Sequence, residues 1–243
     1  ALINCFGIPD TILNIKEFGG VIKEQDFIEQ DYNKFNYSLN NSGSNTLSIP
    51  WLPSNQRFVD SSSFSIFPDS IEFRFKNNLD TIISNPTQSL LEINPNSIKV
   101  TTTYVSGTYG LLEFSMEGYP SASVISSSLI LPLYNDNWWN ISLSRDVLGT
   151  TDNSLNTNYT LIIGEKNSTD IETLESCSIY IDGTIQSDYN QSWNSHGIVN
   201  FGLSGSKFLG EIQEFRYWIN STSIEDFKDH ILNPKSFSNT DET

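Results

Sequence analysis

Residue types that serve as nucleophiles or general bases are scarce in this chain. Its only histidines, His196 and His230, lie far in sequence from its only cysteines, Cys5 and Cys177. The segment 202–206, Gly-Leu-Ser-Gly-Ser, lacks the second glycine of a nucleophile elbow. No spacing fits a zinc site, and no Gly-rich loop with a lysine fits a phosphate cradle. We therefore expect His230 to be a packing or surface residue rather than a base.

The two cysteines leave the redox compartment open. Cys5 and Cys177 could form one disulfide in an oxidising compartment, or they could be two separate buried thiols. Both alternatives fit a chain with so few cysteines.

Composition excludes two classes of partner. The 243 residues include 29 Asp and Glu against 13 Lys and Arg, for a net charge of −16. Such a chain repels nucleic acid and anionic membranes. No apolar run approaches the roughly 18 residues that a membrane span needs. Because 37% of the residues are hydrophobic, a sizeable core is expected. The chain opens at Ala1 without a leader, so we expect a processed chain or a fragment of a longer protein.

Short alternating runs dominate the sequence, so strands must position whatever site the chain holds. In segment 70–76, apolar residues at 71, 73 and 75 alternate with polar ones, as in a half-buried antiparallel strand. Similar runs recur between turn signals. The pattern predicts an all-β antiparallel β-sandwich. The expected strands are 46–49, 63–67, 70–76, 89–93, 97–104, 110–116, 127–133, 138–145 and 159–164.

A hairpin is expected in segment 178–186. The pair Asp182-Gly183 lies between two strand-like halves, and both centres of a type I′ turn need the positive φ that Asp-Gly suits.

One helix is expected, over 223–232. Ser223 can cap it, with Asp226 at the capping-box spacing, and Asn233-Pro234 ends it. Its apolar stripe comprises Ile224, Phe227, Ile231 and Leu232, and we expect Ile212 and Phe215 to dock it. The expected inner face of the sandwich carries Phe73, Phe75, Trp139, Ile141, Leu161, Ile163, Ile179, Ile181, Phe215 and Tyr217.

The last third of the chain carries a family resemblance. Segment 208–218, FLGEIQEFRYW, and segment 223–234, SIEDFKDHILNP, together resemble the closing strand and helical turn of concanavalin A-like (laminin G-like, pentraxin-like) jelly rolls. Segments 70–75, 137–143 and 180–183 resemble earlier strands of those domains, in the same order. The resemblance implies a concanavalin A-like sandwich over 34–243, of the kind found in viral, phage and cell-surface structural proteins. Residues 1–33 would form an irregular lead-in to this single unit.

One branch of that fold, the family-sixteen glycoside hydrolases, suggests an enzyme. There, Glu-x-Asp-x-(x)-Glu supplies a nucleophile, a helper and an acid/base, and Glu24, Asp26 and Glu29 match this spacing. Gln25 departs from the aliphatic residue of the family, and the motif precedes the expected sandwich. In a regular strand Glu29 would also face away from the other two carboxylates, whereas retaining hydrolysis needs two carboxyls about 5 Å apart. We therefore expect no catalytic residues.

The resemblance also implies ligand sites. Lectin-type jelly rolls hold Ca²⁺ with Asp and Asn, so candidate ligands are Asp136, beside Asn135 and Asn137, and Asp152. The same residues are ordinary turn composition.

Two tryptophans are candidates for contact with a glycan. Trp138 points opposite to Trp139, and Trp193 lies in a loop-like stretch. An exposed tryptophan suits a sugar or a protein contact, and packing over the sandwich edge is the alternative.

Glycosylation is permitted by the sequence. Asn158, Asn167, Asn190 and Asn220 are the favoured acceptors, although a chain rich in Asn and Ser produces such triplets by chance. The Asn-x-Ser/Thr triplets begin at residues 36, 40, 140, 158, 167, 190 and 220.

These observations together predict a non-catalytic structural or recognition module on an extracellular or virion surface. Its partners would be other subunits of a surface assembly or glycans, and its one conceivable cofactor is Ca²⁺. The alternatives are a Ca²⁺-dependent lectin and, less favoured, a hydrolase of the β-glucanase type.

Overall fold

A computed structural model describes residues 38–40, 47–51, 67–77, 86–93, 97–148, 155–167, 169–194, 197–201 and 208–234. All of them belong to one compact unit, Tyr37–Thr243. The predicted boundary between a lead-in and the sandwich near residue 34 lies outside these ranges and stays a prediction.

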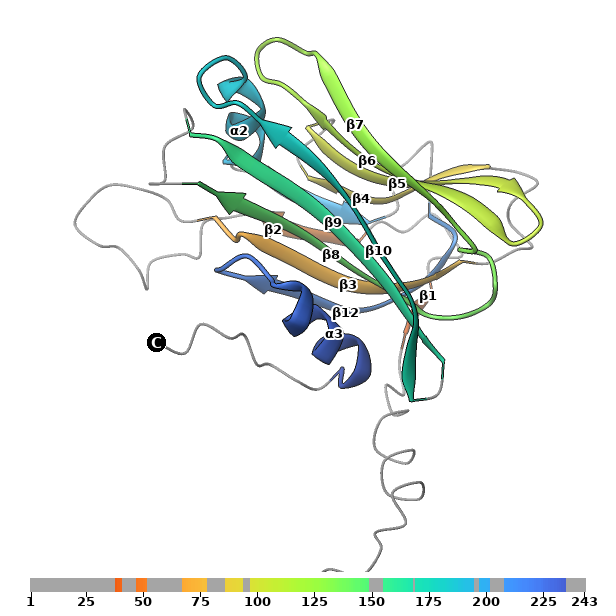
Figure 1. Ribbon diagram of the computed structural model, residues 1–243. Helices are drawn as coiled ribbons and strands as arrows, with labels where there is room; N and C mark the ends of the chain where they lie inside the picture. The colour runs from red at the N-terminus through yellow and green to blue at the C-terminus, as the bar shows by residue number, and fades with distance from the viewer. Residues whose placement is uncertain are drawn as a thin grey trace, which may run out of the picture. The chain divides into compact units, whose positions relative to one another are not determined.

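The predicted antiparallel β-sandwich is confirmed (Figure 1). Two six-stranded sheets form its layers, and every strand pair within the described residues is antiparallel. Sheet A runs in the order β1 (Leu39–Asn40), β12 (Gly210–Trp218), β3 (Ser70–Asn77), β8 (Trp139–Val147), β9 (Thr157–Asn167) and β10 (Asp170–Ile181). Sheet B runs in the order β2 (Leu47–Trp51), β11 (Gly197–Phe201), β4 (Thr87–Ile93), β5 (Ile98–Ser106), β6 (Tyr109–Glu117) and β7 (Val124–Leu131).

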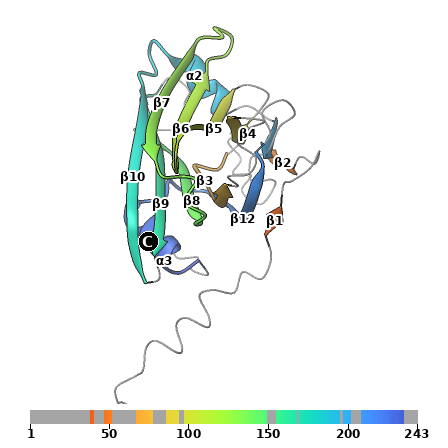
Figure 2. The same cartoon turned by 90° about the vertical axis from the view of Figure 1, so that its right-hand side faces the viewer.

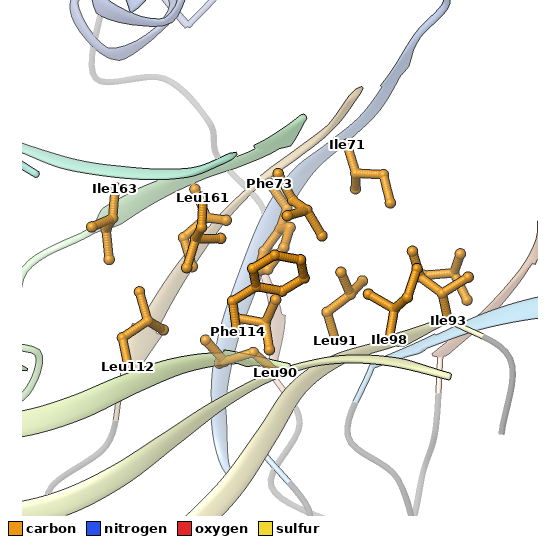
Figure 3. Packing of buried hydrophobic residues seen from close by; sticks show 14 of the residues in the cluster. Ile71, Phe73, Leu90, Leu91, Ile93, Ile98, Leu112, Phe114, Leu161 and Ile163 are labelled. Carbon is orange, nitrogen blue, oxygen red and sulfur yellow. The ribbon is translucent and has the colours of Figure 1, made fainter. Parts of the chain in front are cut away.

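The core lies between the two sheets. Side chains from sheet A, such as Phe73 and Leu161, face Leu112 and Phe114 of sheet B (Figure 3). The expected inner face is confirmed: eight of its ten members are buried, and Phe215 and Tyr217 are partly buried against the same cluster. At one side of the sandwich, β10 lies beside β7 of the other sheet (Figure 2).

The expected strands recur with small shifts, but β2 differs in an instructive way. The expected strand ends at residue 49, yet β2 continues through Pro50 to Trp51. Because β2 is an edge strand and pairs only with β11, the missing N–H of a proline can be tolerated there. The expected strand at 63–67 lies mostly outside the described residues.

A β-bulge interrupts β12. The register against β3 shifts between Gln213 and Arg216, and Glu214 has a φ of 52°. Ile212 before the bulge and Phe215 after it therefore both face the core, although they are an odd number of positions, three, apart. The bulge also places Glu214 and Arg216 against Arg74 of β3, away from the core.

The predicted Asp182-Gly183 hairpin is wrong. Strand β10 ends at Ile181, and the N–H groups of Ile185 and Gln186 donate to the carbonyl of Asp182 in a turn that leads into a second helix, α2 (Ser187–Trp193). The helix was missed because its sequence, SDYNQSW, has no apolar stripe; its buried residues are Tyr189, Asn190, Ser192 and Trp193.

The C-terminal helix α3 (Ile224–Leu232) is confirmed, with Ser223 as its cap. The Ser223 hydroxyl accepts from the N–H of Asp226 at 3.1 Å. The predicted docking partners were wrong, since Ile212 and Phe215 belong to the main core. Phe227 and Ile231 instead pack on Ile162, together with Ile171 and Leu174 of β10, on the side of sheet A that faces away from sheet B (Figure 1).

Within the described residues, neither helix has the length and apolar character that crossing a membrane requires.

Candidate functional site

A buried ion pair joins α3 to sheet A. His230 Nδ1 lies 2.9 and 3.1 Å from the two carboxylate oxygens of Glu72 on β3, and the two side chains are only 5% and 6% exposed. The His230 ring stacks on Trp218 of β12, with ring centroids 5.0 Å apart and planes 8° apart. Since the Glu72 carboxylate can only accept, Nδ1 carries the proton between them. His230 is therefore a packing residue, as expected, and its Nδ1 is engaged by Glu72.

A second charged group lies beside this pair. Glu214 sits 3.6 Å from Arg74 and 3.3 Å from Arg216, and Arg216 also donates to the Pro234 carbonyl, just beyond α3. Burial raises the pKa of Glu214 although both arginines oppose the shift, and burial lowers the pKa of Arg74. The guanidinium of Arg74 also lies 5.7 Å from the centroid of the Trp138 ring.

These residues line a small hollow on sheet A beneath α3, with room for about one water molecule. Both of its carboxylates, Glu72 and Glu214, face cationic or donating partners. A glycosidase needs an acid and a base that are available to substrate. The arrangement therefore suits holding a helix on a sheet better than catalysis.

Sequence reasoning missed this cluster. It assigned Glu72 and Arg74 to a solvent-facing row, because alternation shows which face is polar and not what covers it. The available signal was charge complementarity: Arg216 is in register with Glu72 across β12 and β3.

The predicted Ca²⁺ ligands around Asp136 do not assemble. Asn135 and Asn137 both donate their amide groups to the buried carboxylate of Glu165, and the Asn135 carbonyl accepts from Trp139 Nε1 at 3.2 Å. Asp136 points to solvent, where it pairs with Lys76 at 2.8 Å. Within the described ranges, no three His, Cys, Asp or Glu gather to hold a metal.

The two predicted ligand-binding tryptophans are not exposed aromatic platforms. Trp193 is 0% exposed on α2, not in a loop: its ring packs edge-on against Trp51 at 5.4 Å, and its Nε1 donates to the Pro68 carbonyl at 3.0 Å. A surface ligand cannot contact it. Trp138 is half-buried beside Arg74.

The predicted glycosylation acceptors fall into two groups. Asn190 is 2% exposed, donates to the Leu155 carbonyl and accepts from the Tyr159 hydroxyl, so its amide is not available for modification in the folded protein. Asn158 lies within β9 and is half-buried. Asn167 at the β9–β10 turn and Asn220 after β12 are exposed, and their modification stays a prediction.

Several predicted site residues lie outside the described ranges. They are Glu24, Asp26, Glu29, Asp152 and Cys5. Cys177 is half-buried on β10, where burial raises the pKa of its thiol, and its pairing with Cys5 stays a prediction.

One end of the sandwich gathers exposed apolar side chains, which sequence reasoning also missed. Tyr119, in the β6–β7 turn, is 69% exposed; Ile185, before α2, is 79% exposed; and Leu148, after β8, is 55% exposed. We call the surface formed by 117–124, 146–148, 155–157 and 180–193 the α2 end. Removing such side chains from water is favourable, so they are available for contact with a partner.

Hydrogen bonds hold the segments of the α2 end together. The Tyr119 N–H donates to the Asp188 carbonyl at 3.2 Å, and the Ser121 hydroxyl donates to the Asp188 carboxylate. Asn156 links the other segments: its side chain accepts from the Gly183 N–H at 3.2 Å, and its carbonyl accepts from the Leu148 N–H at 3.0 Å.

The α2 end is acidic as well as apolar. Its segments contain Glu117, Asp146, Asp182 and Asp188 and no lysine or arginine. The hydroxyl and N–H of Thr184 both donate to Asp182, which lowers the pKa of that carboxyl and favours its ionised form. The arrangement suits contact with a neutral polar or a basic partner.

Comparison with known proteins gives no family. No family model matches the chain, and no curated protein matches it.

Solved structures give only distant likenesses. The carbohydrate-binding module CBM40 of a Ruminococcus gnavus IT-sialidase, solved bound to alpha2,3 sialyllactose, is 10% identical with a TM-score of 0.43, over 78% of this chain and 94% of that one. The botulinum neurotoxin serotype D binding domain is 14% identical with a TM-score of 0.42, over 78% of this chain and 43% of that one. TM-scores below 0.5 carry no argument about the function of this chain.

Proposed function

We propose that this chain is a non-catalytic recognition and structural module of an extracellular or virion surface assembly. The observation that carries the proposal is the α2 end, where Tyr119, Leu148 and Ile185 are each more than half exposed at one end of a rigid sandwich. Binding residues on loops held by a β-scaffold are a common way to build a recognition surface.

The buried ionisable groups support the non-catalytic part of the proposal. Glu72 pairs with His230, Glu214 lies between two arginines, and Arg145 donates to Asp69 at 2.9 Å. Each of these acids is engaged in holding elements together. A concanavalin A-like origin fits the antiparallel sandwich with its closing strand and helix, and it belongs to the proposal.

A glycan is the second candidate ligand. Tyr119 presents a largely exposed aromatic ring, and Ser121 in the same turn donates to the carboxylate of Asp188. Sugar sites combine an aromatic face with hydrogen-bonding carboxylates. A glycan array probed with the whole chain, with and without EDTA, tests this candidate and its Ca²⁺-dependent form. Binding that Tyr119→Ala abolishes would support it, and silence across the array would remove it.

The module itself is tested by site-specific crosslinking in the native assembly. A photo-reactive benzoylphenylalanine replaces Tyr119, at the end of β6, or Tyr109, at the beginning of the same strand and 51% exposed. We expect crosslinks to a neighbouring subunit from position 119 and few from position 109. Equal yields, or none from position 119, would count against the α2 end as the contact surface.

A further inference from the structure

Strand β7 is an edge that lacks the usual protection. Within the described sheets it pairs on one side only, with β6, so its other side presents unpaired backbone N–H and C=O groups. Natural edge strands are blunted by charge, proline or short length. The sequence of β7, VISSSLIL, contains no charged residue, no proline and no glycine over eight residues.

The other described edges are all blunted. Strand β1 has two residues, and β2 carries Pro50. Strand β10 carries Asp170, Glu172 and Glu175, all exposed. The net charge of the chain is −16, and among the described edge strands of eight residues or more, β7 is the one along which two copies can approach without facing carboxylates on the pairing strand itself.

The order of residues along β7 identifies its partner as the same strand. On either side of Ser127 the sequence has a serine, then two aliphatic residues. Antiparallel pairing of two copies centred on Ser127 therefore places serine opposite serine and aliphatic opposite aliphatic side chains. Val124 would lie opposite Ile130, and Ser126 opposite Ser128.

Exposure supports this register. Val124 is 62% and Ile130 is 64% exposed in the single chain, and both lie on the outer side of sheet B, where they are in register with Glu117 and Leu111 of β6. Pairing in this register would cover each with the other. Ile125 and Leu129 lie on the inner side of sheet B and already pack against the core, so pairing would make the cores of the two copies continuous across the dimer interface.

We propose that β7 pairs with β7 of a second copy of this chain about a two-fold axis at Ser127, which joins two copies of sheet B into one continuous sheet. The surface is distinct from the α2 end, so this proposal stands apart from the proposed recognition function. Failure of either one leaves the other in place.

The neighbouring strand β10 determines how the association depends on salt. Because β10 lies beside β7, two copies paired through β7 bring the exposed carboxylates Glu172 and Glu175 of both copies closer together. Salt screens this repulsion, so we expect the dissociation constant of the dimer to fall as ionic strength rises from about 0.02 to about 0.5 M.

The test is sedimentation equilibrium of the whole chain and matched lysine variants. Ser128→Lys places a cation on the exposed side of β7, and we expect it to weaken dimerisation at least about tenfold. Thr101→Lys is the control. Thr101 on β5 and Ser128 on β7 both pair with Glu113 of β6, from its two sides, but β5 is an interior strand and not an edge. It should change the dissociation constant by less than about twofold.

The register is tested by compensation. The double variant Ser126→Glu with Ser128→Lys places opposite charges across the two-fold axis and should restore dimerisation lost in Ser128→Lys alone. A chain that stays monomeric at about 500 μM overturns the proposal. So does an equal effect of Thr101→Lys, a double variant that remains as weak as Ser128→Lys, or a dissociation constant that rises with salt.

Discussion

The pair between His230 and Glu72 offers a quantitative test of what holds α3 on sheet A. In His230→Phe, an aromatic ring can still stack on Trp218, but the donor to the Glu72 carboxylate is lost. Because Glu72 is 6% exposed, bulk water does not reach its carboxylate, and the hollow beneath α3 has room for about one water molecule at most. The substitution therefore isolates the polar contact from the packing contact.

The expected loss can be bracketed. Losing a hydrogen bond to a charged group costs about 1.5–3 kcal/mol. We therefore expect His230→Phe to lower the free energy of unfolding by about 1.5–3 kcal/mol at pH 7.

Urea unfolding at pH 7, followed by circular dichroism, measures the loss. Adding Glu72→Leu to His230→Phe removes the stranded acid and should recover most of the loss, because an apolar pair often replaces a buried ion pair at little cost. Glu225→Gln is the matched control. Glu225 pairs with Lys228 on the same helix at 2.8 Å but is 72% exposed, so its loss should stay below about 0.5 kcal/mol.

Two results would refute the reasoning. A loss below about 0.5 kcal/mol at pH 7 would mean that the buried contact contributes nothing beyond packing. A double variant that recovers none of the loss would mean that the stranded acid is not what destabilises His230→Phe.

Two further substitutions test other parts of the fold. Asp69 is paired with Arg145, yet burial raises the pKa of Asp69, so its ionised form is disfavoured in the folded protein and its contribution to stability grows as the pH falls. In urea unfolding, the wild-type chain should therefore gain stability relative to Asp69→Asn between pH 7 and pH 5. A relative loss of stability would contradict this sign. In Gly210→Ala, the added methyl group would overlap the Lys76 carbonyl on the paired strand and the Phe208 ring. We therefore expect the free energy of unfolding in the same assay to fall by about 3 kcal/mol. A fall of less than about 1 kcal/mol would show that β12 can shift to make room.

The sandwich could be predicted from the sequence because period-two alternation is a direct consequence of strand geometry. Segment 70–76 shows the limit of that signal. Its inner face, Phe73 and Phe75, was correctly placed in the core, but its outer face was assigned to solvent when α3 covers part of it. Alternation divides a strand into two faces, and only tertiary packing decides whether both are covered.

The errors at β12 and α2 have different physical origins. Ile212 and Phe215 are three residues apart, an odd separation that regular alternation cannot place on one face, so the sequence did hold a signal for the bulge at Glu214. At Asp182-Gly183 the pair was read as a hairpin, but tertiary contacts decide there: Tyr189 and Trp193 of α2 are buried against the sandwich. Local propensity alone could not find that helix.

The candidate site was harder to foresee than the fold. Asp136 and Trp193 were chosen for residue type, yet one pairs with Lys76 at the surface and the other is a core residue. Tyr119 and Ile185 belong to turns more than sixty residues apart in sequence, and they share one surface only because α2 contacts the β6–β7 turn. Such a surface is a property of topology and carries no local pattern.

The strand order of sheet A has a consequence for how the chain is made. Strand β3, near the beginning of the sandwich, lies between β8 and β12, and β12 is the last of the described strands along the chain. Until the ribosome has released residues 210–234, β3 has an open edge, and the outer side that α3 covers is bare. Segment 70–77, which contains Phe73 and Phe75, is therefore synthesised early and covered late, so a chaperone would have to bind it in the meantime. A chain truncated before residue 210 would be prone to aggregate.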